Sequence, residues 1–339
     1  MELPTLPPPP KGKIMATIFV VVLLTSAITG YYSYTATSTA IEHCKDRELQ
    51  IASTLIQNDL IEQANKALAR ATMVARMPIV INSMREQNRK PIVDALVPMF
   101  LLLREKYGVR EGQFHVPPAT SFLRIYDVEA GHGEDLSSFR EMVLMANKEL
   151  KPFSGVEIGR RGLSIRGIDV IRDDNGHYGS IEIGMDFSSI LNNVKKNLGF
   201  EAGVFVDDQK MTSVATLLPK AEAERVIGGF CNTEATDWNF IRTVVTPDFL
   251  RQVNDVTARS QSIGGVDYGF VAIPLLDFKG TPIGSVVAAR NFMEFANALN
   301  GALVKAIFLA FLQGLLLIFV ILVLINSYFV LPLAEGKKE

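Results

Sequence analysis

Residues 168–187 read IDVIRDDNGHYGSIEIGMDF, and this stretch gives the clearest signal for the fold of the region around it. Apolar residues dominate on both sides of an Asp-Asp-Asn-Gly segment at residues 173–176, which is a strong signal for a tight turn. The pattern predicts strands over residues 164–172 and 179–187, paired antiparallel in a hairpin.

A similar pattern returns near the end of the chain. Residues 268–292 again give an apolar strand, a turn with Asp and Gly, a Gly-Ser pair and a second apolar strand, which favours duplication of one structural unit. Further strands are predicted at residues 113–116, 121–126, 203–207, 240–245, 268–276 and 282–290. The expected fold class is α+β, with two stacked antiparallel-sheet modules.

Helical patterns accompany the first module. Residues 36–77 contain no Pro or Gly and carry one apolar stripe, so we expect a long stalk helix that Pro78 ends or kinks. A second helix is expected from Pro91, a favoured first-turn position, to about Tyr107. A third is predicted over residues 135–150, with Asp135 as its N-cap.

Two long apolar runs flank these elements. Residues 14–34 read IMATIFVVVLLTSAITGYYSY, which is 21 residues without a charge and enough to cross a hydrocarbon core of about 30 Å as a helix. A cleaved signal peptide is the alternative for this run, although the helical pattern continues directly beyond it. The second run, residues 306–330, is longer and contains only two strongly polar residues, Gln313 and Asn326. We therefore expect two transmembrane helices.

The second run carries small residues at a regular spacing. Ala302, Ala306, Ala310 and Gly314 recur every four residues, so they share one face of a helix. Small residues at this spacing let another membrane helix approach closely. The sequence thus predicts a helix-contact face.

Two spans place both ends of the chain on one side of the membrane. Lysines are denser on the short tails, which favours the cytoplasm for both ends and an extracytoplasmic location for the main region. The expected parts are a Pro-rich tail (1–13), a first span (14–34), a stalk helix (35–90), a membrane-distal module (91–198), a membrane-proximal module (199–300), a second span (301–330) and a tail (331–339).

The composition argues against several functions. A formal net charge of −2 provides no basic surface for nucleic acid. Cys44 and Cys231 lie in no CxxC pattern, and we expect two separate buried thiols, with a bond between them as the alternative. The four histidines lack metal-ligand spacing, and the motifs GxSxG, HExxH and GxxxxGK[ST] do not occur. We therefore expect no enzyme activity, no metal and no cofactor.

Three stretches of the first module resemble a known family. Residues 114–124 read FHVPPATSFLR, residues 133–140 read GEDLSSFR with Asn147 shortly after them, and residues 155–167 read GVEIGRRGLSIRG. Together they are similar to the double Cache sensor domain, type 3, of bacterial chemoreceptors and sensor kinases. The resemblance implies a periplasmic ligand-sensing domain anchored in the bacterial inner membrane.

The resemblance also implies cytoplasmic domains that pass the signal on. Such receptors continue into a HAMP helix pair and a signalling domain, and residues 331–333, Leu-Pro-Leu, look like a HAMP opening. We expect either a fragment that ends before the output domains or an output carried by a separate protein.

Arginines gather in the first module, where an inward guanidinium would suit a carboxylate ligand. Strand alternation places Arg124 on the same face as Phe122. The candidate ligand-binding residues are Arg124, Arg140, Arg166, Arg161, His115, Ser121, Phe122 and Asn147. The alternative is a structural role for the arginines, for which the available partners are Glu157, Asp169 and Glu182.

The expected function is the input part of a transmembrane sensory receptor in chemotaxis or two-component signalling. Its expected partners are a small carboxylate or amino-acid-like ligand, a second copy of the chain in a homodimer, membrane lipid and a cytoplasmic output. A non-sensory accessory or adaptor subunit with the same fold is the alternative.

Overall fold

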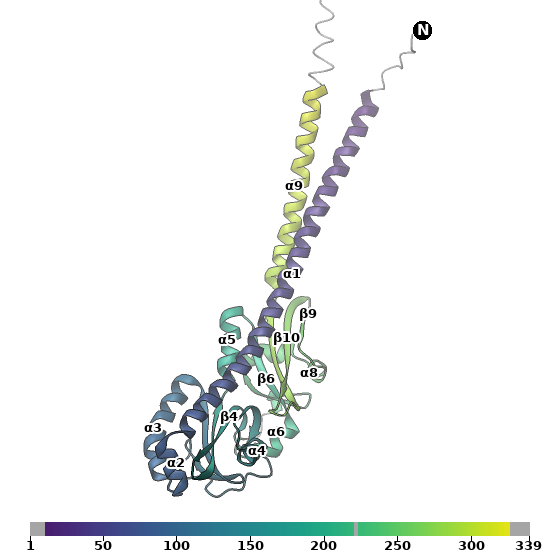
Figure 1. Ribbon diagram of the computed structural model, residues 1–339. Helices are drawn as coiled ribbons and strands as arrows, with labels where there is room; N and C mark the ends of the chain where they lie inside the picture. Colours follow the sequence, from purple (N-terminus) through teal and green to yellow (C-terminus); the bar gives the residue numbers. More distant parts are fainter. Residues whose placement is uncertain (1–10, 220–222, 326–339) are drawn as a thin grey trace, which may run out of the picture. The chain divides into compact units, whose positions relative to one another are not determined.

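The computed structural model describes residues 11–219 and 223–325 (Figure 1). The chain divides into two compact units. Residues 47–291 form the double-sheet unit, and residues 1–46 with 292–339 form the two-helix unit. Most of the predicted Pro-rich tail, the end of the second apolar run and the HAMP-like segment lie outside the described residues.

The first module of the double-sheet unit is a five-stranded antiparallel sheet with the strand order β2-β1-β5-β4-β3. Its strands are β1 (Val109–Val116), β2 (Thr120–Arg124), β3 (Phe153–Gly159), β4 (Gly162–Asp173) and β5 (Gly176–Met185). β4 and β5 form the predicted hairpin, with Asp173 opposite Gly176 at its turn. The sequence pattern did not indicate β3.

The second module is a six-stranded antiparallel sheet with the order β7-β8-β6-β11-β10-β9. Its strands are β6 (Glu201–Asp207), β7 (Val226–Ile227), β8 (Phe230–Ala235), β9 (Thr257–Ile263), β10 (Val266–Leu276) and β11 (Pro282–Asn291). The hairpin of β10 and β11 corresponds to the repeat in the sequence. Two antiparallel sheets confirm the predicted fold class.

The helices are α1 (Lys11–Ala75), α2 (Pro78–Arg85), α3 (Lys90–Tyr107), α4 (Glu141–Glu149), α5 (Ser188–Leu198), α6 (Asp208–Val214), α7 (Trp238–Val244), α8 (Pro247–Arg251) and α9 (Met293–Ile325). α1 ends just before Pro78, which then opens α2, so the predicted break is confirmed. Proline lacks an amide hydrogen and is tolerated in a first turn but not in a helix interior. α3 matches the predicted second helix.

The part of α1 within the double-sheet unit packs closely on the first sheet. A Cβ at Gly167 of β4 would lie only 2.1 Å from the backbone nitrogen of Leu68, so the glycine makes the close approach possible. Beyond the end of α1, Arg76 donates a hydrogen bond of 2.8 Å to the carbonyl oxygen of Val170. α1 therefore covers the face of β4 that bears Gly167.

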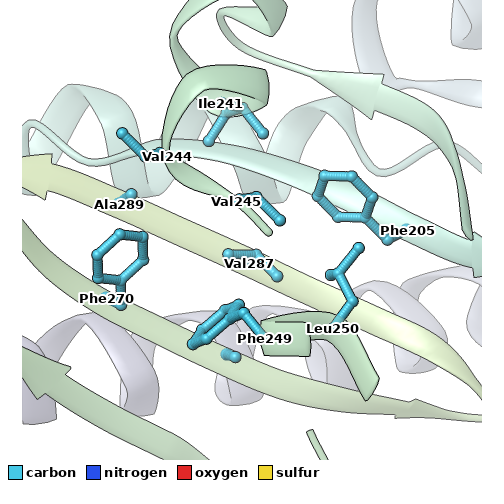
Figure 2. Packing of buried hydrophobic residues seen from close by; sticks show 10 residues of the cluster. Phe205, Ile241, Val244, Val245, Phe249, Leu250, Phe270, Val287 and Ala289 are labelled. Carbon is cyan, nitrogen blue, oxygen red and sulfur yellow. The ribbon is translucent and has the colours of Figure 1, made fainter. Parts of the chain in front are cut away.

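The second module has its own apolar core, shown in Figure 2. Phe205, Phe270 and Val287 project from the sheet toward α7 and α8, which contribute Ile241 and Phe249. The Phe249 and Phe270 rings are 5.4 Å apart between centroids. Burial of these side chains holds both short helices on the sheet.

Two predicted elements are wrong. Residues 240–245 were predicted as a strand, but most of them belong to α7, because the Asp237 carboxylate caps that helix by accepting a hydrogen bond from the Phe240 amide at 3.0 Å. α4 begins at Glu141 rather than at Asp135. The Asp135 carboxylate instead accepts a hydrogen bond from the Ser137 amide within a turn.

The two cysteines are separate, as predicted. Cys231 is buried, but Cys44 is exposed, so its predicted burial is wrong. The buried stripe of α1 passes through Leu49, Ala52 and Ile56, and position 44 lies off that stripe.

Within the two-helix unit, the predicted small-residue face forms the contact between α1 and α9. A Cβ at Gly30 would lie 3.3 Å from the Cβ of Ala310, and one at Gly314 would lie 3.4 Å from the Oγ of Ser26. Larger side chains at these positions would force the helices apart. Both helices contain a stretch that is long and apolar enough to cross a membrane.

Candidate functional site

One face of the first sheet is polar although it is buried. Glu111, Gln113 and His115 alternate along β1, and residues directly opposite in an antiparallel pair share a face. Gln113 is opposite Glu182 of β5, and His115 is opposite Ser180. α4 and the segment before it cover this face, and Met142 and Val143 pack there against Ile168 and Val170 of β4. We call this surface the polar face of the first module.

A network of buried charges lies on the polar face. Glu182 accepts hydrogen bonds from both Arg140 and Arg166. Arg166 also donates to Glu111 Oε2 at 3.0 Å, and Arg140 donates through Nε to Glu157 Oε2 at 2.8 Å. Arg166 and Glu182 have no exposed surface. Charges without water need such partners, and each side chain therefore fixes the position of the next.

The network shifts the pKa values of its members. Burial would raise the pKa of Glu182, but the positive charges of Arg140 and Arg166 hold it at about 2. Burial also opposes the charge on Arg166, yet Glu111 and Glu182 keep its pKa above the ordinary value. Burial lowers the pKa of His115 to about 3, and both arginines act in the same direction. His115 is therefore neutral at physiological pH.

The polar face also holds buried polar atoms that have no hydrogen-bond partner. Six of the eleven such side-chain atoms in the described part of the chain belong to it or to the helix over it. They are Glu111 Oε1, His115 Nε2, Arg124 Nε, Asn147 Oδ1, Ser164 Oγ and Arg166 Nη2. Buried polar atoms are rarely left unsatisfied, so a cluster of them with both donors and acceptors indicates a place for polar groups from outside the chain.

The structure brings six of the eight predicted site residues to this surface. Arg140 and Arg166 belong to the charge network. Ser121 accepts a hydrogen bond from Gln113 Nε2 at 2.9 Å, and His115 Nδ1 lies 3.3 Å from the Ser180 Oγ.

The other two residues of this group lie at its edge. Arg124 pairs with Glu134 in the segment before α4. Asn147 of α4 donates to the Pro118 carbonyl oxygen at 3.0 Å. Asn147 also lines an outer cleft of about 650 Å³ beside Pro118, Leu144 and Met145.

Phe122 and Arg161 lie apart from the polar face. A register shift between β1 and β2 makes Phe122 an additional residue in β2, and the Arg89 guanidinium lies 5.4 Å above its ring. Phe122 thus contacts Arg89, whereas the sequence pattern had placed it beside Arg124. The Arg161 guanidinium stacks 4.6 Å from the Tyr126 ring.

Sequence reasoning missed Glu111 and Gln113 as members of the polar face, and it considered Glu157 and Glu182 only as structural partners. A charged residue in the middle of an apolar strand, such as Glu182 between Ile181 and Ile183, was the available signal. The structural alternative describes Arg140 and Arg166 well, because both are paired with glutamates. Their role toward a ligand stays a prediction.

Residues 42–293 match the family model dCache_3, described as the double sensory domain of two-component sensor kinase. A comparison with curated proteins gave no match.

The chain is also similar to solved sensor domains. The ligand-binding domain of the Campylobacter jejuni chemoreceptor Tlp3 in complex with L-valine is 10% identical, with 80% of this chain and 98% of that chain covered and a TM-score of 0.45. The extracellular domain of the putative histidine kinase vpHK1S-Z8 is 13% identical, with 76% of this chain and 98% of that chain covered and a TM-score of 0.46. The sensor domain of the V. cholerae histidine kinase DctB is 8% identical, with 73% of this chain and 97% of that chain covered and a TM-score of 0.42.

The family match spans both sheet modules and most of the chain, whereas all three TM-scores are below 0.5. On the strength of the family match, the chain belongs to the double Cache family of sensory domains, type 3.

Proposed function

We propose that this chain is the input part of a transmembrane sensory receptor, and that the polar face of its first module binds a small extracytoplasmic ligand. The single observation that carries the proposal is the cluster of six unpartnered polar atoms on that face. The face is buried beneath α4, and largely desolvated surfaces with a few convergent polar groups are typical of small-molecule sites.

The unpartnered atoms of the polar face favour an amino-acid-like ligand over a simple carboxylate. The carboxylates of Glu111, Glu157 and Glu182 are balanced by the guanidiniums of Arg140 and Arg166 and by Arg110, whose Nε lies 3.7 Å from Glu111 Oε1. Both acceptors and donors are left unpartnered, such as Glu111 Oε1 and Arg166 Nη2. A ligand with an ammonium group would donate to such an acceptor, and its carboxylate would accept from such a donor.

The proposed topology places the double-sheet unit outside the cytoplasm and both chain ends inside. The two apolar helices of the two-helix unit support membrane anchorage by their length and composition. The proposed assembly is a homodimer in the bacterial inner membrane, and its output lies in the cytoplasm.

A contact between the modules offers a route for the signal. Phe278, in the turn between β10 and β11, donates its amide hydrogen to the Val156 carbonyl oxygen at 3.0 Å and packs beneath α4. Lys279 in the same turn pairs with Glu141 of α4. β11 ends at Asn291, and α9 begins at Met293. A ligand that moves α4 would thereby move the strand that leads into α9, by roughly 1–2 Å if it resembles other switching helices.

Calorimetric titration of the full chain in lipid nanodiscs with amino acids and simple organic acids tests the proposal. We expect saturable binding of at least one amino acid, and roughly tenfold weaker binding in Asn147→Ala and His115→Gln, since each variant alters a polar contact. Lys151→Ala, at an exposed residue outside the lining of the outer cleft, and His177→Gln are the matched controls and should bind as the parent does. Absence of amino-acid binding, or equal losses in variants and controls, would refute the proposed site.

A further inference from the structure

A second cleft lies between the two modules, and none of the residues assigned to the polar face lines it. Its volume is about 610 Å³, within the range of small-molecule sites. The first module contributes Arg110 and Leu163, and the second contributes Met211, Leu218, Arg225 and Thr233. A molecule in this cleft would therefore touch both modules.

The polar wall of the cleft favours an anion. Arg225 donates to Asn232 Oδ1 at 3.0 Å and lies 5.7 Å from the Trp238 ring centroid, and no carboxylate in residues 11–219 or 223–325 forms an ion pair with it. Thr233 Oγ1 is buried without a hydrogen-bond partner. A second guanidinium, that of Arg110, donates to the Leu163 carbonyl oxygen at 3.1 Å and lies near Met211 and Leu218. A guanidinium and a free hydroxyl together suit a carboxylate.

One carboxylate, that of Asp208, also lines the cleft. Burial and, after it, this carboxylate raise the pKa of the Cys231 thiol to about 11. Arg110 is paired with Glu111, its Nε lying 3.7 Å from Oε1, whereas Arg225 has no carboxylate partner in the described part of the chain. The Arg225 guanidinium therefore favours a ligand with negative charge, and it would repel an ammonium group placed next to the ligand's carboxylate.

Part of the lining of the cleft is apolar. Leu163, Met211 and Leu218 supply it, and Leu218 approaches the β3–β4 turn so closely that a Cβ at Gly162 would lie 2.7 Å from its Cδ1. An aliphatic chain gains free energy by burial against such a wall, at about 0.8 kcal/mol per methylene group.

Hydrogen bonds connect the two modules beside the cleft. The Leu217 amide donates to the Arg160 carbonyl oxygen at 2.9 Å, and Arg160 donates to Thr216 Oγ1 at 3.2 Å. Arg110 is adjacent to Glu111 of the buried charge network. Occupation of the cleft would therefore bias the arrangement of the two modules.

We propose that this cleft is a second ligand site, separate from the polar face, that binds a small monocarboxylate with a short unbranched hydrocarbon chain. The carboxylate lies at Arg225 and Thr233, and the chain lies along Leu163, Met211 and Leu218.

The test is a calorimetric titration of the full chain in nanodiscs with hexanoate, with empty nanodiscs subtracted. Hexanamide keeps the chain without the charge, and norleucine adds an ammonium group. Thr212→Glu places a negative charge on a residue that lines the cleft, whereas Ser213→Glu places it on the next exposed residue of α6, outside the lining. Arg225→Gln removes the unpaired positive charge and keeps an amide donor for Asn232.

We expect saturable hexanoate binding that is roughly tenfold weaker in Thr212→Glu and in Arg225→Gln and unchanged in Ser213→Glu. Hexanamide and norleucine should bind at least about tenfold more weakly than hexanoate. Equal binding of hexanamide or norleucine, equal effects of the two glutamate variants, or no saturable binding would overturn the proposal. His115→Gln should leave hexanoate binding unchanged, and a loss there would assign hexanoate to the polar face and overturn the second site.

Discussion

At the scale of single residues, the first module depends on ionisable groups that are held away from water. Arg166 has no exposed surface and contacts Glu111 and Glu182. Removing one member of such a network leaves a buried charge unpaired, which typically costs about 3–5 kcal/mol. The polar face is therefore also part of the stability of the module, and binding tests need variants that preserve these pairs.

His115 should make stability depend on pH. Its pKa is lowered from 6.5 to about 3 by burial, so the unfolded chain binds more protons between these values. The free energy of unfolding is unaffected by this histidine above about pH 6.5. It declines as the pH falls toward about 3, with a slope of at most about 1.4 kcal/mol per pH unit. Denaturation followed by circular dichroism should show a shallower decline for His115→Gln. Parallel curves for the parent and the variant would contradict this.

Glu234 should act in the opposite sense. Burial, with Asp186 nearby, raises its pKa from 4.5 to about 7, so the folded chain binds more protons in this window. Its contribution to stability is present below about pH 4.5 and is lost as the pH rises through about 7. Glu234→Gln should therefore become more stable relative to the parent as the pH rises, by up to about 1.4 kcal/mol per pH unit.

Glu224→Gln is the control for this measurement, because Glu224 is exposed and forms only a surface pair with Arg242. Its melting temperature should follow that of the parent across the same pH range. A Glu234→Gln variant that also follows the parent would show that the carboxylate titrates normally.

At the scale of elements, the position of α1 on the first sheet depends on one glycine. A Cβ at Gly167 would lie 2.1 Å from the Leu68 nitrogen and 2.3 Å from its Cα, and a helix backbone cannot yield locally. Gly167→Ala should lower the free energy of unfolding by about 3 kcal/mol, the upper range for overpacking. Chemical denaturation measures this.

Gly301→Ala is the matched comparison. Nothing lies within 4 Å of a Cβ at this helical position, so the variant should be neutral or more stable by about 0.5–1 kcal/mol. Equal stability of the Gly167→Ala protein and the parent would show that α1 is not held against the sheet at this point.

At the scale of the whole molecule, the two units serve different purposes. The double-sheet unit carries the candidate sites, and the two-helix unit carries the apolar stretches that suit a membrane. Within the latter, the close contact of Gly30 with Ala310 gives a direct test of helix pairing.

A disulfide should form between Gly30→Cys and Ala310→Cys in a Cys44→Ser background. The 3.3 Å between the two Cβ positions is close to the roughly 3.5–4.5 Å that a disulfide requires. The control is a second pair, Gly30→Cys with Phe308→Cys. Phe308 is 62% exposed and lies on another side of α9. After membranes are treated with a mild oxidant, the gel mobility of the protein should show an intramolecular crosslink only for the first pair. Equal crosslinking of both pairs would contradict the helix contact.

Much of this organisation could be predicted from local patterns. The hairpin of β4 and β5 follows from its turn residues, the break at Pro78 from the chemistry of proline, and the contact face of α9 from the spacing of small residues. α7 could not be predicted, since its apolar run fits a strand equally well and only the Asp237 cap and the neighbouring sheet decide for a helix.

The candidate site was only partly accessible from sequence. Of the six predicted residues at the polar face, His115 and Arg166 reach it by strand alternation, which is a local rule, whereas Arg140 and Asn147 reach it from the start and the interior of α4. Phe122 does not join them, because the register shift between β1 and β2 depends on pairing with a distant strand. Glu111 and Glu182 were missed as site residues for a similar reason.

Periodicity, turn residues and motifs are local, so the order of residues was enough to predict two antiparallel modules, two apolar helices and a resemblance to a sensory family. The pairing of Arg140 and Arg166 with Glu111, Glu157 and Glu182, and the cleft that Arg110 and Arg225 line, came only from the folded structure. Which opposite charges meet in a desolvated interior depends on how distant strands align, and the chain order does not contain that information.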